Sequence, residues 1–132
     1  MECLLQNSLN AKNKGARGER EFSSFLREHG YEAIRGCQHA GRDATGHEAP
    51  DVIHDIPGVH FEVKRTEKLH IVPALGQASN DAGEKIPIVA WRRNNWPWMA
   101  ILPMEDLMEF IREWIPANSE INKEINKEIN ND

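Results

Sequence analysis

Residues 50 to 64 read Pro-Asp-Val-Ile-His-Asp-Ile-Pro-Gly-Val-His-Phe-Glu-Val-Lys. An Asp precedes a short apolar segment, a Pro-Gly pair reverses the chain, and a second segment ends in Glu-Val-Lys. Because successive side chains of a strand point to opposite faces, the apolar side chains at odd positions from Val59 to Val63 share one face. The polar side chains at even positions from His60 to Lys64 share the other. The stretch therefore predicts a β-hairpin with one apolar and one polar face.

The register of this hairpin decides which charged groups meet. If the Pro-Gly pair forms a two-residue loop, Val63 lies opposite Val52 and Lys64 opposite Asp51. Asp51, Glu62 and Lys64 then share a face, with Glu62 one diagonal step from Asp51. Two interpretations remain open at this point. The hairpin is either half exposed with a surface ion pair, or it holds a divalent metal beside a phosphodiester.

A further acidic residue comes from the segment before this hairpin. Residues 16–29 predict an amphipathic helix that ends at Gly30, with apolar residues at i, i+3, i+4 and i+7. Glu19 lies three residues before Phe22 and seven before Leu26, so it extends the inward-facing stripe. It is either a first-turn Glu favoured by the helix dipole or a third acid directed at a metal site.

Taken in order, these motifs resemble the PD-(D/E)xK nuclease superfamily. The resemblance covers about residues 15 to 115 and is strongest to the Holliday junction resolvases of archaeal and phage type. The matching positions are Glu19-Arg20, Arg35, Pro50-Asp51 and Glu62-Val63-Lys64. One departure is the loop from 36 to 49, which lacks the serine that such resolvases often place near the scissile strand. Thr45 or His39 would replace it, or the substrate differs.

The resemblance implies a metal-dependent DNA endonuclease that acts on branched DNA, most of all on four-way junctions. Mg²⁺ is the implied cofactor, with Mn²⁺ as a plausible substitute. Its ligands would be Asp51, Glu62, the Val63 carbonyl and Glu19. Lys64 would orient the attacking water or stabilise the negative charge that develops on the phosphate. The two-fold symmetry of a four-way junction implies a homodimer.

The charge distribution suits an enzyme better than a general coating protein for nucleic acids. The net charge is −5, and acidic residues gather in the last predicted helix and the tail. Basic residues instead surround the predicted site, where they would contact DNA phosphates. The candidate DNA-binding residues are Arg17, Arg20, Arg35, Arg42, Arg65 and Lys68.

The remaining segments predict an α/β fold in which helices flank a mixed β-sheet, in the order αβββαβ. Strands are expected over 31–35, 86–91 and 98–102, and helices from Pro73 to Gly83 and over 104–115. The resemblance implies a restriction-endonuclease-like core. Gln77, on the first of these helices, either faces the site or is exposed to solvent.

We expect residues 1–14 to be a flexible N-terminus, 15–116 to form the nuclease domain, and 117–132 to be a low-complexity tail. The tail repeats Ile-Asn-Lys-Glu and is predicted to be disordered rather than a marginal helix. No apolar stretch reaches membrane-spanning length, the start does not read as a signal peptide, and the two cysteines form no disulfide framework. The expected location is therefore cytoplasmic. A zinc site at Cys37, His39 and His47 lacks the second ligand pair that would support it.

Two other functions remain open from the sequence. One is a nicking or structure-independent endonuclease of the same superfamily, which would cut linear duplex as well as junctions. The other is a non-catalytic DNA-binding module on the same fold, which would bind no metal.

Overall fold

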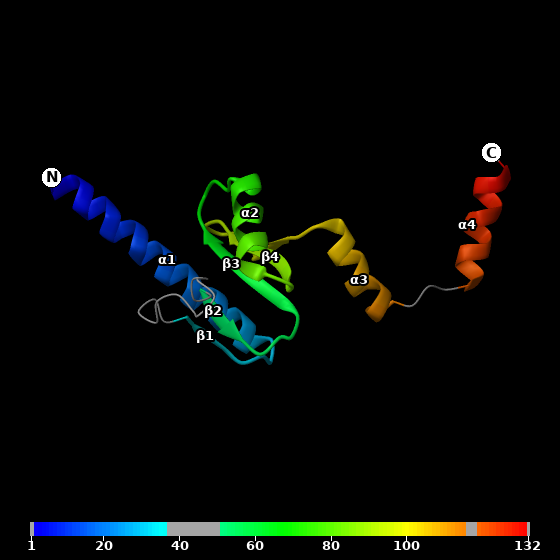
Figure 1. Cartoon of the computed structure of the whole chain (residues 1–132), viewed down its shortest axis with the longest axis horizontal. Helices are drawn as coiled ribbons and strands as arrows, with labels where there is room; N and C mark the ends of the chain where they lie inside the picture. Colours follow the sequence, from blue (N-terminus) through cyan, green and yellow to red (C-terminus); the bar gives the residue numbers. More distant parts are fainter. Residues whose placement is uncertain (1, 37–50, 116–118, 132) are drawn as a thin grey trace. The chain divides into compact units, whose positions relative to one another are not determined.

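The computed structural model describes residues 2–36, 51–115 and 119–131, with side chains of the first helix described from Gly15 onward. The chain divides into two units, residues 1–102 and 103–132 (Figure 1). The first unit contains α1 (Glu2–Glu28), β1 (Ala33–Arg35), β2 (Val52–His54), β3 (Val59–Arg65), α2 (Ile71–Ala82), β4 (Ile86–Arg92) and β5 (Met99–Ile101). The second contains α3 (Met104–Trp114) and α4 (Ser119–Asn131). This order confirms the expected α/β class.

The strands of the first unit form two sheets. β3 pairs with β4 in parallel, with Glu62 opposite Val89, and β4 pairs with β5 antiparallel. Parallel neighbours need a crossover connection, and α2 supplies it. β3 is therefore an edge strand of a mixed three-stranded sheet. The second sheet is the antiparallel pair β1–β2.

The predicted pairing between β2 and β3 is wrong. β2 pairs with β1, in a register that sets Ile53 opposite Ile34, and β3 pairs with β4. The turn explains the difference, since Gly58 has φ +78° after Pro57. Pro followed by a left-handed Gly is the sequence of a type II turn, whose twist splays flanking strands rather than pairing them.

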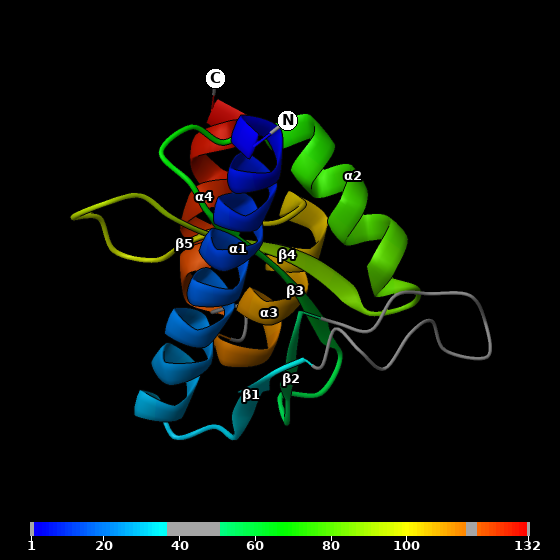
Figure 2. The ribbon, with the colours of Figure 1, turned by 90° about the vertical axis from the view of Figure 1, so that its left-hand side faces the viewer.

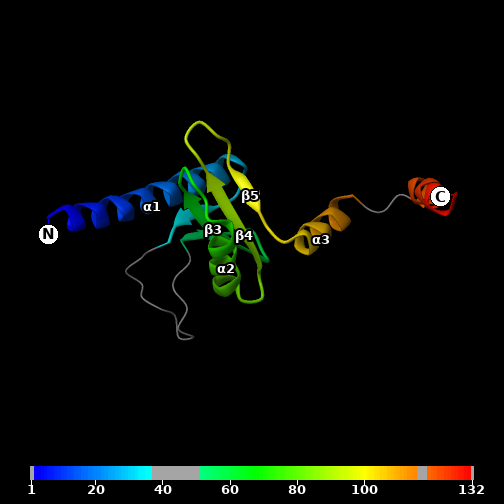
Figure 3. The ribbon, with the colours of Figure 1, turned by 90° about the horizontal axis from the view of Figure 1, so that it is seen from above.

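Both faces of the three-stranded sheet are covered, in contrast to the single core face that alternation along β3 predicted. Phe22 and Leu26 of α1 form one cluster, against which Phe61 and Val63 pack. Small residues of α2 pack on the opposite face around Val89, which is fully buried. Figures 2 and 3 show β3 and β4 lying between α1 and α2. His60 and Glu62, on the α2 face, are consequently buried.

Helices lie at both ends of the described chain. α1 begins at Glu2 rather than near residue 16, and α4 spans Ser119–Asn131. Lys, Glu and Gln have high helix propensity, and in the tail Glu120 precedes Lys123, and Glu124 precedes Lys127, by the three residues that bring opposite charges together on a helix. The division into a nuclease domain with flexible ends stays a prediction. Within the second unit, the rings of Phe110 and Trp114 stack 5.6 Å apart.

The approach of α1 to β3 depends on Gly18. A Cβ at this position would lie 2.5 Å from the Cβ of Arg65, closer than real contacts allow. We expect Gly18→Ala to lower the free energy of unfolding by about 1–3 kcal/mol through overpacking, although Ala is the better helix former. Urea denaturation measures this.

Gly15 lies on the same helix and provides the matched control for Gly18, because a Cβ at Gly15 would meet no atom within 4 Å. Gly15→Ala should raise the free energy of unfolding by about 0.5–1 kcal/mol. If Gly18→Ala were as stable as the wild type, the close packing of α1 on β3 would be contradicted.

Candidate active site

Glu62 lies at the centre of the polar face of β3. Its side chain is 4% exposed, and its Oε1 lies 3.5 Å from the Nζ of Lys64, two residues along the same face. Lys64 also donates a hydrogen bond of 3.1 Å to the Oε1 of Gln77 on α2. The lysine is thus held between a buried carboxylate and an amide, which fixes the position of its charge.

Asp51 approaches this face from the residue before β2. Its carbonyl accepts a hydrogen bond of 2.7 Å from the N–H of Gly36, which ties it to the end of β1. Burial raises the pKa of Asp51 from 3.8 to about 7, and the negative charges of Glu62 and Glu19 add to the shift. Lys64 and His60 oppose it. Asp51 therefore lies within electrostatic range of both other predicted acids and of the predicted lysine.

Glu19 faces inward from α1, as the helical stripe predicted, and is 6% exposed. Its Oε2 accepts a hydrogen bond of 2.7 Å from the Nε of Arg35 on β1. A buried carboxylate is costly unless a cation compensates it, and Arg35 provides that cation. The sequence predicted that Arg35 contacts a DNA phosphate, and the structure shows in addition that Arg35 forms an ion pair with Glu19.

The structure thus brings together Glu19, Asp51, Glu62 and Lys64, which come from three separate elements. The oxygen donors of these acids fit a hard divalent cation such as Mg²⁺. The raised pKa of Asp51 supports this fit, because burial raises it first and the charges of Glu62 and Glu19 add to the shift, and a cation among the carboxylates would favour the ionised form. Val63 packs its side chain against the core cluster, so only its backbone carbonyl remains for a metal.

The predicted DNA-binding residues are placed in two ways. Arg17, Arg20 and Lys68 are exposed. Arg65 is half buried and donates hydrogen bonds of 2.8 Å to both Glu21 and Asn94. Residues 37–50 lie outside the described residues, and with them the positions predicted at Arg42, Thr45, Cys37, His39, His47 and Pro50.

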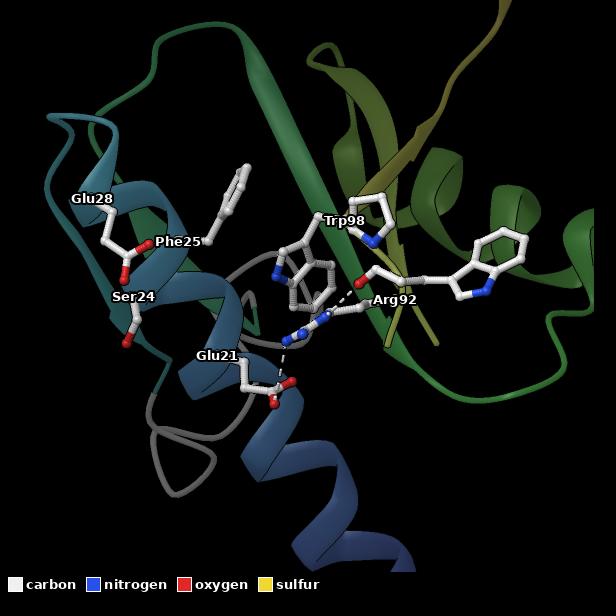
Figure 4. Close-up of a pocket in the computed structure, with 8 residues that line it drawn as sticks. Glu21, Ser24, Phe25, Glu28, Arg92 and Trp98 are labelled. Carbon is white, nitrogen blue, oxygen red and sulfur yellow. Dashed lines mark hydrogen bonds and ion pairs between the residues drawn. The ribbon is translucent and has the colours of Figure 1, made fainter. Parts of the chain in front are cut away.

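A cavity of about 410 Å³ in the described part lies away from the acidic cluster, and no residue of that cluster lines it. It lies beside α1 and is lined partly by Phe25 and Trp98 (Figure 4). Arg92 reaches into it from β4, with its Nη1 3.6 Å from Glu21 and its Nε donating a bond of 2.9 Å to the Trp96 carbonyl. These contacts join α1 to the sheet, so we assign the cavity a structural role.

Two residues on the α2 face were not predicted as part of the site. His60 is buried beside Glu62, with its Nε2 3.9 Å from the Glu62 Oε2. Asp81 of α2 approaches the same pair. The sequence held a signal for each: His60 alternates with Glu62, and Asp81 follows Gln77 by four residues, which is one helical turn.

An α/β core with acids and a lysine gathered at an edge strand is the arrangement of restriction-endonuclease-like nucleases of the PD-(D/E)xK type. The sequence model of the archaeal Holliday junction resolvase (Hjc) family matches residues 10–131, and the chain belongs to that family. It is thus a DNA endonuclease of the Holliday junction resolvase type. Searches of curated proteins and of solved structures gave no significant match. Within the described residues, no helix is both long and apolar enough to cross a membrane.

Proposed function

We propose that the chain is a Mg²⁺-dependent endonuclease that nicks four-way DNA junctions as a homodimer. The observation that carries this proposal is the electrostatic coupling of Asp51 to Glu62, Glu19 and Lys64. Burying like charges together is unfavourable, so a fold that does so needs a function for them or a cation between them.

Each acid has a distinct role in the proposal. Asp51, Glu62 and the Val63 carbonyl hold the metal, and Glu19 completes the cluster directly or through water. When bound, Mg²⁺ polarises the scissile phosphate and lowers the pKa of a water ligand. Arg35 orients Glu19 through their 2.7 Å contact.

Lys64 acts on the reacting phosphate. Its ammonium group lies at the site edge, 31% exposed, so it reaches a phosphate while still paired with Glu62. It orients the attacking water or stabilises the charge of the transition state. Gln77 holds the ammonium in place through its 3.1 Å hydrogen bond.

Basic residues near the carboxyl end of β3 contact neighbouring phosphates. Arg17 and Arg65 line a recess of about 260 Å³ together with Thr66 and Asn94. Arg20 and Lys68 are exposed and free to reach the backbone of a DNA arm. Such contacts position the substrate without reading its sequence.

The substrate is tested by comparing an end-labelled four-way junction with a linear duplex of the same arm sequence. With Mg²⁺, the protein should nick the junction at symmetrically related positions and cut the duplex at least about tenfold more slowly. Neither substrate should be cut in EDTA. Equal rates on both substrates would favour the structure-independent endonuclease and contradict the junction preference. Binding of junctions with no cutting in any divalent metal would favour the non-catalytic module.

A further inference from the structure

The α2 face of β3 carries a second cluster of potential ligands, of which the proposed mechanism uses only Glu62. One ligand atom from each of His60, Glu62 and Asp81 lies within 4.8 Å of the others. His60 and Glu62 are two residues apart on β3, so they share a face. Asp81 lies in the last turn of α2, between the buried residues Ala78 and Ala82 that pack this helix on the sheet.

His60 provides an independent indication that this cluster binds a ligand. The residue is 9% exposed, and its Nε2 has no hydrogen-bond partner within the described part of the chain. Leaving a buried polar atom unsatisfied is costly, so such atoms are rare without a function. The Nε2 lies 3.9 Å from the Glu62 Oε2, which is too far for a hydrogen bond. It is within the span of two ligands on one ion, since metal bonds to N and O of about 2.0–2.2 Å allow up to about 4.4 Å.

The two oxygens of Glu62 point to different partners. Oε1 lies 3.5 Å from the Lys64 Nζ, and Oε2 lies 3.9 Å from the His60 Nε2. A carboxylate directed two ways is suited to bridge two cations. Two carboxylates and a neutral imidazole also carry the net charge that balances a divalent ion.

The ligand types indicate which ion this cluster prefers. Mg²⁺ favours octahedral oxygen ligands and loses its water reluctantly. Imidazole suits transition metals, whose affinity for nitrogen donors exceeds that of Mg²⁺. The cluster with Asp51 is made of oxygen donors, whereas this one combines nitrogen with oxygen.

We propose that His60, Glu62 and Asp81 form a second divalent-cation site that takes a transition-metal ion in preference to Mg²⁺ and shares Glu62 with the Asp51 site. The sharing of Glu62 rests on the proposed function. The binding by His60 and Asp81 does not, because neither residue has a role in it.

Mn²⁺ binding to the full chain tests this proposal without reference to cleavage. Titration followed by electron paramagnetic resonance should show two Mn²⁺ per wild-type chain, and excess Mg²⁺ should displace one of them. The Mn²⁺ that resists Mg²⁺ should show spin-echo modulation from a ligating ¹⁴N of histidine. Asp81→Asn and His60→Gln should each remove this ion and its nitrogen signal. Asp51→Asn should retain the Mg²⁺-resistant ion together with its nitrogen signal.

His70→Gln is the matched control, because His70 is exposed at the start of α2. It should leave the titration unchanged. Asp81→Asn changes a half-buried surface residue, so it tests the site even if the buried His60 variant fails to fold. Unchanged Mn²⁺ uptake in Asp81→Asn, or no nitrogen modulation in the wild type, would overturn the second site. Failure of the proposed function would appear separately, as absence of junction nicking by the wild type in Mg²⁺.

Discussion

Glu62→Gln is expected to abolish junction cleavage while the protein still binds the junction. The substitution keeps the shape of a side chain that is 3% exposed and removes its charge. The loss should be at least on the order of 10²–10³ in rate, the effect of removing one preorganised electrostatic group from an active site. Single-turnover cleavage at saturating protein measures it.

The physical reason is that Glu62 interacts with several groups of the site at once. It pairs with Lys64, neighbours His60 and raises the pKa of Asp51. The neutral amide of Glu62→Gln would leave Lys64 without its anionic partner and would leave any bound metal without a charged ligand at this position. Junction binding depends on phosphate contacts and should be retained or slightly strengthened.

Glu28→Gln is the matched control for Glu62→Gln, because Glu28 is an exposed residue at the end of α1. It should cleave at the wild-type rate. Wild-type cleavage by Glu62→Gln would show that β3 does not carry the catalytic acid. Loss of binding together with cleavage, checked by mobility shift in EDTA, would show that Glu62 acts through the fold instead.

Asp51→Asn is expected to eliminate cutting and, in metal-free buffer at pH 8, to stabilise the folded protein. Burial and the charges of Glu62 and Glu19 raise the pKa of Asp51 to about 7 in the folded chain. The full shift would correspond to several kcal/mol, but Asp51 is partly exposed to solvent. We therefore expect a gain of about 1–2 kcal/mol in the free energy of unfolding.

The pH dependence follows from the sign of this shift. Between pH 3.8 and about 7 the folded protein keeps a proton on Asp51 that the unfolded chain has released. Stability is therefore greatest below this window and is lost as the pH rises through it. Asp51→Asn removes the dependence, so the variant and the wild type should diverge as the pH rises from 5 to 8. Urea denaturation in EDTA measures both profiles.

Asp55→Asn tests whether the Asp51 effect is specific, since Asp55 lies exposed just after the other end of β2. Its Oδ1 accepts a 3.0 Å hydrogen bond from the N–H of Glu32, which an asparagine oxygen can also accept. It should follow the wild-type profile. Parallel profiles for Asp51→Asn and the wild type would contradict the raised pKa of Asp51.

Much of the site follows from local periodicity in the sequence. Alternation along β3 correctly grouped Glu62 with Lys64, and the stripe of α1 correctly turned Glu19 inward. Both rest on contacts within one element, where the spacing of residues fixes the face. The element order also followed from local signals such as Gly83, which ends α2 with φ +61°.

The contacts between elements could not be read in the same way. The sequence placed Asp51 beside Glu62 through a hairpin that does not form, yet the two meet because β2 still lies near β3. The rings of His54 and Phe61 remain 4.9 Å apart despite the lost pairing. The parallel pairing of β3 with β4 brings α2 over the polar face, and only this non-local arrangement brings Asp81 to His60.

The most direct test of the account is the cleavage of a labelled four-way junction by the wild type and by Glu62→Gln, at equal bound fraction, with and without Mg²⁺. Paired symmetrical nicks are expected only in the reaction of the wild type with Mg²⁺. The junction should stay intact in the other three reactions. Cleavage by the wild type in EDTA, or by Glu62→Gln with Mg²⁺ at a similar rate, would contradict the account.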